Sequence, residues 1–354
     1  MRVLLIADRD FARRESALLA RLEMGLVGEG VRVSLALPDD AALAETRVYT
    51  NLLRFRDRAS FLSRPARARD LLERLAQGAD LDRPVDIVHA LGEDTWSFAA
   101  ALAQHAEALL ALEVWAIRLV RRAVELADHS SMLLVPDRAI ERALRREEGR
   151  GSVRHVPWGV PTEAASTRSE VPSVVLVGSG DDARAARAAL EGIALAQGPA
   201  PMIFIDADLA SRARLWPVAS RLGLLDRVTL IPDAEAQRTL PLRCDLLVHP
   251  EAPGESRSLL LEAMGAGMCI VARTDPAVTD LLDTRTARLV DSTQPAAWAD
   301  AISPLLADPA LRARLGESAR AYVRAEHRPS AHISGVLDAY EWMASRESIP
   351  FSGS

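Results

Sequence analysis

The strongest constraint on the fold is a regular alternation between short apolar runs and longer Ala-, Leu- and Arg-rich segments with helical periodicity. The apolar runs have the length of buried strands, and their alternation with helical segments is typical of parallel α/β architecture. The alternation occurs twice along the chain. We predict strands at 3–7, 31–36, 86–90, 109–114, 131–135 and 153–156, and then at 173–177, 202–206, 228–231, 245–249, 269–272 and 287–290.

A polar, strand-poor passage at 161–172 separates the two series and reads as a linker. The chain has 354 residues, which is long for one domain and ordinary for two. We therefore predict an α/β protein with two doubly wound, Rossmann-like domains, at 1–160 and 173–330, followed by a helix and tail at 331–354. A ligand is expected in the cleft between such domains.

Composition narrows the function classes. The net charge of −6 argues against a nucleic-acid-binding protein. All 43 basic residues are arginine, as expected from a GC-rich bacterial genome. The two cysteines, Cys244 and Cys269, are expected to be reduced core thiols. The first ten residues resemble a β-strand more than a signal peptide, and no apolar run approaches the ~20 residues of a membrane span. We expect a cytoplasmic protein.

The stretch from 245 to 272, DLLVHPEAPGESRSLLLEAMGAGMCIVA, predicts a strand, a polar loop, a short helix and a second buried strand. In open α/β sheets such a loop lies at the carboxyl end of the strands, where ligands bind. Ser256 and Ser258 stand where the helix should begin, so backbone N–H groups there would attract phosphate. Glu262 could present a carboxylate to sugar hydroxyls. This pattern predicts half of a nucleotide-sugar site.

Four motifs resemble the retaining glycosyltransferases of family 4, which have the GT-B fold: LLLEAMGAGMCIVA (259–272), RHVPWGV (154–160), DIVHALG (86–92) and the closing ISGVLDAYEWMAS. The resemblance covers nearly the whole chain. It implies sugar transfer from a nucleotide sugar with retention of configuration, as in hexosyltransferases, without a metal or other cofactor. It also implies a donor on the second domain, an acceptor on the first, and a terminal helix that packs back toward the first domain.

The resemblance assigns roles to individual residues. The catalytic candidates are His89, beside the donor sugar, and Glu255, as the sugar-contacting carboxylate. The donor-binding candidates are Arg184, Ser256, Arg257, Ser258 and Glu262. The acidic pair Asp206 and Asp208 is expected to end a strand and cap a helix, so no metal site is assigned.

The sequence departs from the family pattern at three places. Gly254 stands where the family has its sugar-contacting Glu, and Glu251 and Glu255 are displaced candidates for that group. Ser179 replaces a phosphate-binding Arg, whereas Arg184 keeps a positive charge at the family's Lys position. The first loop (7–10, ADRD) has two carboxylates in place of glycines, which disfavours a close diphosphate.

These departures leave alternatives open. The second hypothesis is a catalytically silent GT-B protein that acts as a binding or scaffold subunit. A phosphorylase or epimerase of the same fold is weaker, because a phosphorylase would need a cofactor lysine and the chain has none. Glu113 could line the cleft or cap the helix that follows. The basic, aromatic-bearing stretch at 54–69 could contact an anionic acceptor or a membrane surface, or be a solvated amphipathic segment. The acceptor, whether glycan, lipid or small molecule, is not indicated.

Overall fold

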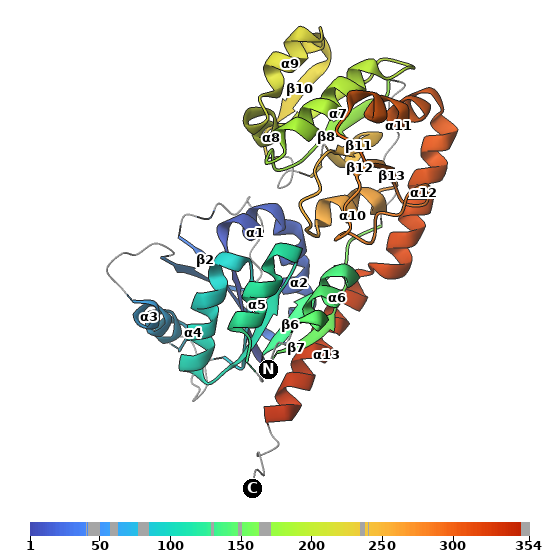
Figure 1. Ribbon diagram of the computed structural model, residues 1–354. Coiled ribbons are helices and arrows are strands. Elements are labelled where there is room, and N and C mark those ends of the chain that lie inside the picture. Colours follow the sequence, from blue (N-terminus) through green and yellow to red (C-terminus); the bar gives the residue numbers. More distant parts are fainter. Residues whose placement is uncertain are drawn as a thin grey trace. The chain divides into compact units, whose positions relative to one another are not determined.

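The computed structural model describes residues 1–39, 41, 50–56, 63–76, 85–128, 131–147, 151–162, 171–233, 238–239 and 241–347. Internal contacts divide the chain into two units (Figure 1). Unit 1 comprises Met1–Gly159 and Pro329–Ser354, and unit 2 comprises Val160–Arg328. The last helix of the chain therefore belongs to the same unit as the N-terminus.

Unit 1 is built on a seven-stranded parallel sheet with the order β3-β2-β1-β4-β5-β6-β7. The strands are β1 (Arg2–Ala7), β2 (Arg32–Pro38), β3 (Asn51–Phe55), β4 (Ile87–Leu91), β5 (Leu109–Glu113), β6 (Met132–Val135) and β7 (Ser152–His155). The helices are α1 (Arg9–Arg14), α2 (Ser16–Gly28), α3 (Arg64–Ala76), α4 (Trp96–Ala106), α5 (Val120–Leu126), α6 (Arg138–Arg146) and α13 (Pro329–Glu347), with short 3₁₀ turns η1 (Glu93–Thr95) and η2 (Ile117–Leu119).

Unit 2 repeats this plan with a six-stranded parallel sheet in the order β10-β9-β8-β11-β12-β13. The strands are β8 (Ser173–Leu176), β9 (Met202–Asp206), β10 (Val228–Ile231), β11 (Leu246–His249), β12 (Cys269–Arg273) and β13 (Arg288–Val290). The helices are α7 (Ala183–Leu195), α8 (Ala207–Arg212), α9 (Leu215–Arg221), α10 (Ser258–Gly265), α11 (Pro295–Ala307) and α12 (Pro309–Glu326), with η3 (Leu225–Arg227) and η4 (Pro241–Arg243).

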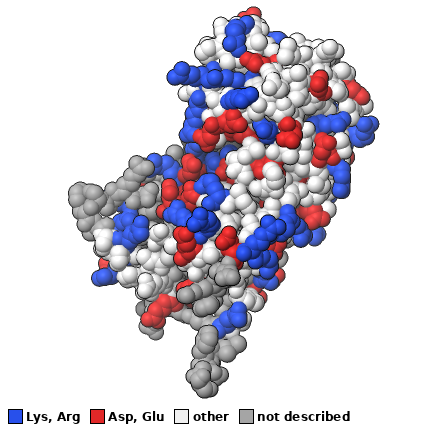
Figure 2. Space-filling model, viewed as in Figure 1, with Lys and Arg blue, Asp and Glu red and all other residues white. Residues whose placement is uncertain are grey.

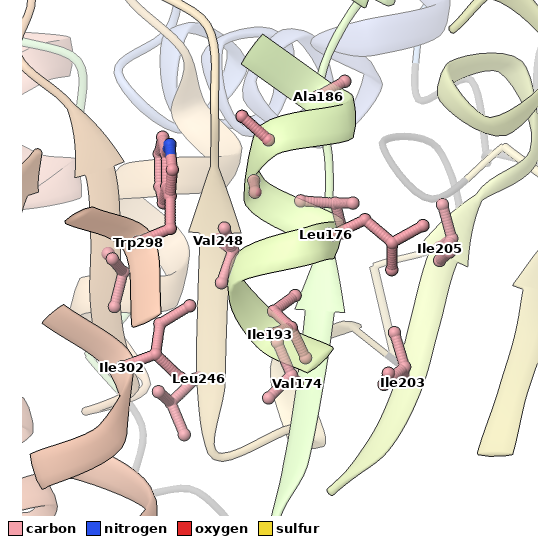
Figure 3. Close-up of a cluster of buried hydrophobic side chains, with 14 of the residues drawn as sticks. Val174, Leu176, Ala186, Ile193, Ile203, Ile205, Leu246, Val248, Trp298 and Ile302 are labelled. Carbon is pink, nitrogen blue, oxygen red and sulfur yellow. The ribbon is translucent and has the colours of Figure 1, made fainter. Parts of the chain in front are cut away.

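The core of unit 2 follows from the period of two along its strands. Alternate residues of β8, β9 and β11 point to one face of the sheet, where α7 and α11 cover them (Figure 3). Trp298 of α11 is fully buried in this layer. Gly192 lets α7 approach α11 closely, because a Cβ at that position would lie 2.3 Å from the Cβ of Trp298. The two helices thus hold the sheet face that supports the loops described below.

All twelve predicted strands are present, and the structure adds one, β3. The segment NLLRF of β3 is a short apolar run that contains Arg54 and leads directly into the basic stretch at 54–69. Its pattern therefore did not indicate a strand. The expected linker at 161–172 and the tail after Glu347 lie mostly outside the described residues. Within the described residues, no helix is long and apolar enough to cross a membrane.

Candidate active site

Each sheet has one point where the chain turns from one side of the sheet to the other. In unit 2 this point lies between β8 and β11, and in unit 1 it lies between β1 and β4. Loops that follow such neighbouring strands diverge to opposite faces and leave a crevice at their carboxyl ends, which is where open α/β sheets bind ligands. The candidate site in unit 2 is therefore formed by the loop after β8 and the loop after β11.

A carboxylate of the chain itself connects these two loops. Glu251, in the loop after β11, is only 3% exposed. It accepts four hydrogen bonds from the β8–α7 loop, with Oε2 bound by the backbone N (2.6 Å) and Oγ (2.8 Å) of Ser179, and Oε1 bound by the backbone N of Gly180 (2.8 Å) and of Asp182 (3.2 Å). A Cβ at Gly178 would lie 2.9 Å from Oε2, so a glycine is required for this approach.

The Glu251 contact changes the interpretation of the β8–α7 loop. Three backbone N–H groups and a hydroxyl converge there, which is the kind of concave donor set that binds anions. Glu251 already supplies the anion. The sequence analysis considered Glu251 as a displaced sugar-contacting carboxylate, but the structure gives its oxygens to this loop.

The start of α10 is the second part of the site. Ser258 is the first helical residue, and Arg257 occupies the N-cap position without a capping hydrogen bond from its side chain. The first N–H groups of a helix have no acceptor within the helix and carry the positive end of its dipole. Ser256, Arg257 and Ser258, which were predicted to lie at this helix start, are all buried.

Arg238 is a site residue that the sequence analysis missed. Its Nη1 lies 2.9 Å from Oε1 of Glu262 and donates to Oγ of Ser258 at 2.8 Å. Arg238 and Glu262 are 7% and 5% exposed in their side chains, so this ion pair is shielded from solvent. Arg238 lies in a segment without strand or helix periodicity, and nothing in its sequence neighbourhood distinguishes it from the other arginines.

A second buried ion pair lies in the same loop, between Glu255 and Arg257. The preceding Gly254 has a φ of +70°, and its N–H donates to Oδ2 of Asp275 at 2.7 Å. The position where the family has its carboxylate is thus a turn in a conformation that favours glycine. Glu255 is the displaced carboxylate closest in sequence, and Arg257 accompanies it.

The structure brings four of the predicted donor-site residues together around α10, with Glu255 beside them, and places the fifth elsewhere. Arg184 is exposed in the first turn of α7, the helix after the Glu251-bound loop. Two arginines, Arg238 and Arg257, stand at the start of α10, where positive charge is unfavourable unless an anion is near. Glu262 pairs with Arg238 and Glu255 pairs with Arg257, so the four charges balance formally.

In unit 1, His89 occupies a different environment from the predicted one. It is the central residue of β4, since the strand continues to Leu91, and it is 0% exposed. Its Nδ1 lies 2.7 Å from the Tyr340 hydroxyl of α13, and its Nε2 lies 3.3 Å from Oε2 of Glu113. Both ring nitrogens have partners within unit 1. His89 is thus engaged within unit 1, and its expected place beside the donor sugar stays a prediction.

The charge state of the Tyr340 hydroxyl follows from its burial. Burial, and to a lesser degree the charge of Glu113, raise the pKa of Tyr340 well above its usual value of 10.0, so the hydroxyl keeps its proton. The Trp158 indole N–H donates to the other Glu113 oxygen at 2.6 Å. Glu113 therefore neither caps a helix nor lines a crevice, because Trp158 binds one of its oxygens and His89 contacts the other.

Asp8 ends β1 at the crevice of unit 1. It accepts hydrogen bonds from the backbone N of Phe11 (2.7 Å) and of Asp94 (3.2 Å), and thus connects the loops after β1 and β4. Gly92, with a φ of +108°, leaves room for the carboxylate, because a Cβ there would lie 2.3 Å from Asp8 Cγ. Burial raises the pKa of Asp8 to about 6. The first loop is compact and carries this buried carboxylate, and that it disfavours a diphosphate stays a prediction.

Asp206 ends β9 and caps α8 by accepting from the backbone N of Asp208 (2.9 Å) and Leu209 (3.0 Å), which confirms its predicted role. Among the residues that the structure describes, no group of three or more His, Cys, Asp or Glu side chains could hold a metal ion.

The chain has the GT-B fold. Its two Rossmann-like domains have parallel sheets with helices, and the final helix belongs to the first domain. Residues 189–322 match the sequence family described as glycosyl transferases group 1.

Particular proteins share the fold over almost the whole chain. The sucrose-phosphate synthase from Thermosynechococcus elongatus superposes with a TM-score of 0.77 and 18% identity, covering 98% of this chain and 100% of that structure. HepE from Anabaena, in complex with UDP and glucose, has a TM-score of 0.77 and 16% identity, covering 97% of this chain and 100% of that one. At these identities the likeness shows the fold alone.

Sequence relatives cover less. The D-inositol 3-phosphate glycosyltransferase of Xylanimonas cellulosilytica is 36% identical over 129 residues, which are 36% of this chain and 31% of the relative. The protein of the same name from Salinispora arenicola is 32% identical over 129 residues, or 29% of its length. The alignment thus spans under a third of each relative.

Proposed function

We propose that this protein is a glycosyltransferase that takes its sugar from a nucleotide-sugar donor bound on unit 2. The observation that carries the proposal is the buried set Arg238, Ser258 and Glu262 at the start of α10, at the carboxyl end of β11. The match of residues 189–322 to a glycosyltransferase family supports it, as do the UDP complexes of the structural neighbour HepE.

The donor diphosphate is proposed to bind at the N-terminus of α10. Helix N–H groups and the guanidinium of Arg257 would face it, and Ser256 would line the same loop. Because Glu251 fills the β8–α7 loop, that loop contributes little to the diphosphate, and Arg184 on α7 is a second, more exposed source of charge.

The nucleoside is proposed to bind through Glu262, whose carboxylate would accept hydrogen bonds from the ribose hydroxyls. Arg238 holds that carboxylate in place, since it binds Glu262 and Ser258 together. Glu255 is proposed to contact the donor sugar, with Arg257 as its partner.

Further parts of the proposal follow from the family resemblance. Transfer would retain the anomeric configuration, need no metal, and use an acceptor held by unit 1. The leaving diphosphate would be stabilised by the α10 dipole and Arg257 in place of the missing Arg at Ser179. A cytoplasmic location and contact with a membrane surface through 54–69 also stay predictions.

The test is a ligand screen with UDP, GDP, ADP and their glucose conjugates, read by thermal shift and isothermal titration calorimetry. We expect one nucleoside diphosphate to stabilise the protein, by about 2.7 kcal/mol at a hundred times its Kd. Glu262→Ala should abolish that shift. Glu191→Gln, at a partly exposed position of α7, loses only an ion pair with Arg221 and should retain the shift.

No stabilisation by any of these ligands would refute the donor site. Hydrolysis or transfer of the bound nucleotide sugar, followed by NMR at the anomeric carbon with and without EDTA, then tests turnover, retention and metal independence. A nucleotide sugar that binds and is never turned over would instead indicate the silent, scaffold-like alternative.

A further inference from the structure

Unit 1 contains a cavity of about 450 Å³ that the proposed donor site does not use. It lies at the carboxyl ends of β2 and β3, against one face of α3. Four arginines and two aspartates line it, namely Arg54, Arg56, Arg67, Arg74, Asp39 and Asp70. A volume of this size accommodates a small ligand such as a substituted monosaccharide.

The arginines come together through the fold. Residues 67, 70 and 74 are spaced three and four apart and therefore share one face of α3. Leu71 and Leu75, which lie beside these residues on the helix surface, are buried and anchor α3 in unit 1. Arg54 and Arg56 come from β3 and the residue after it. In Figure 2, basic side chains gather over the region of unit 1 where Figure 1 places α3.

Backbone carbonyls hold several of these guanidinium groups in place. Arg54 donates to the carbonyls of Pro38 (2.9 Å) and Ala41 (2.8 Å), and Arg74 donates to the carbonyl of Arg54 at 2.7 Å. Arg67 donates to the carbonyl of Arg56 at 2.9 Å. Carbonyls are neutral acceptors, so they orient the arginines without cancelling their charge.

The two carboxylates offset only part of this charge. Asp70 lies 2.9 Å from Arg74, and Asp39 lies 3.8 Å from Arg56. Among the described residues that line the cavity, four guanidinium groups stand against two carboxylates, which is a formal excess of positive charge. A solvated amphipathic segment, the simpler interpretation of 54–69, does not require arginines from a strand and a helix to converge on one cavity.

We propose that this cavity binds an anionic, polyhydroxylated ligand such as a sugar phosphate, as the acceptor of the transfer reaction. Guanidinium forks match the oxygens of phosphate or carboxylate groups. Asp39 and Asp70, exposed by 51% and 62% in their side chains, can accept hydrogen bonds from ligand hydroxyls. The acceptor role rests on the proposed function, whereas binding itself does not.

The test is isothermal titration calorimetry of the full chain with D-glucose 6-phosphate, inorganic phosphate and D-glucose. We expect glucose 6-phosphate to bind, inorganic phosphate to bind more weakly because it lacks the hydroxyl contacts, and glucose to show no binding. Arg56→Gln and Arg74→Gln should each weaken glucose 6-phosphate at least about tenfold. Arg69→Gln, which removes an exposed charge from the same helix outside the cavity, should change the affinity less than twofold.

Equal affinity of the wild type and Arg56→Gln for glucose 6-phosphate, or an equal loss in Arg69→Gln, would overturn the proposal. So would adsorption to phosphatidylglycerol vesicles that depends on Arg56 and Arg74 without any binding of glucose 6-phosphate, because the occupant would then be a membrane. UDP binding in Arg56→Gln should match the wild type. If the protein binds glucose 6-phosphate through these arginines but binds no nucleotide, the proposal for the cavity stands and only the donor site is refuted.

Discussion

Replacement of Glu251 by glutamine should destabilise unit 2 markedly. Both carboxylate oxygens accept two hydrogen bonds at 2.6–3.2 Å, in an environment where the side chain is 3% exposed. Glutamine keeps one carbonyl oxygen and turns an NH₂ group toward donors. Because an unsatisfied buried donor costs about 1–3 kcal/mol, the loss at one oxygen amounts to about 2–4 kcal/mol.

For a unit of this size such a loss lowers the unfolding temperature by roughly 5–12 °C. Differential scanning calorimetry of the full chain measures it. Glu191→Gln on α7 is the matched control, since it removes a partly exposed ion pair worth less than about 1 kcal/mol. A decrease for Glu251→Gln no larger than that of the control would refute the view that the carboxylate holds the two loops together.

The same residue offers a gain-of-binding test. Glu251→Ser leaves the N–H groups of Gly180 and Asp182 and the Ser179 donors without their anion. We expect 50 mM inorganic phosphate to stabilise this variant more than the wild type, by about 2 kcal/mol if the Kd of the loop is about 1 mM. A gain of this kind cannot arise from misfolding. Equal stabilisation of both proteins by phosphate would contradict the assignment of an anion-binding loop.

Two further predictions concern unit 1. The pKa of Asp8 is raised from 3.8 to about 6, so its contribution to stability is fully present below pH 4 and is lost as the pH rises through 6. When the pH is lowered from 7 to 4, the free energy of unfolding in urea should therefore rise by up to about 3 kcal/mol more for the wild type than for Asp8→Asn. A difference between the two proteins that does not change with pH would contradict the buried carboxylate. Tyr340→Phe leaves His89 Nδ1 without this hydrogen-bond partner and should cost about 1–3 kcal/mol, measured in the same assay at pH 7. A cost below 0.5 kcal/mol, the usual size of a surface change, would show that the hydroxyl contact is unimportant.

The fold was accessible from the sequence because its signal is local. Strand and helix periods repeat twice, and each buried strand of the two sheets is a short apolar run. β3 was the exception, since Arg54 interrupts its run and its guanidinium turns to backbone carbonyls at the end of β2. Local patterns cannot report such a partner.

The candidate site was accessible only in part. The α10 motif gave Ser258 and Glu262, because the helix and its start are encoded by adjacent residues. Arg238 and the role of Glu251 depend on contacts across 24 and about 70 positions of the chain, which no spacing rule in a single sequence specifies. His89 shows the same limit, because its contact with Tyr340 spans 251 positions of the chain.

The carboxylate of Glu251 also determines when the β8–α7 loop becomes ordered. In many nucleotide-binding proteins a ligand phosphate completes the hydrogen bonds of such a loop, so part of its conformational entropy is lost on binding. Here the chain supplies the anion, and that entropy is lost when unit 2 folds. The amides of Gly180 and Asp182 should accordingly resist hydrogen exchange in the ligand-free protein, and a nucleotide that arrives at α10 meets a neighbouring loop that is already rigid.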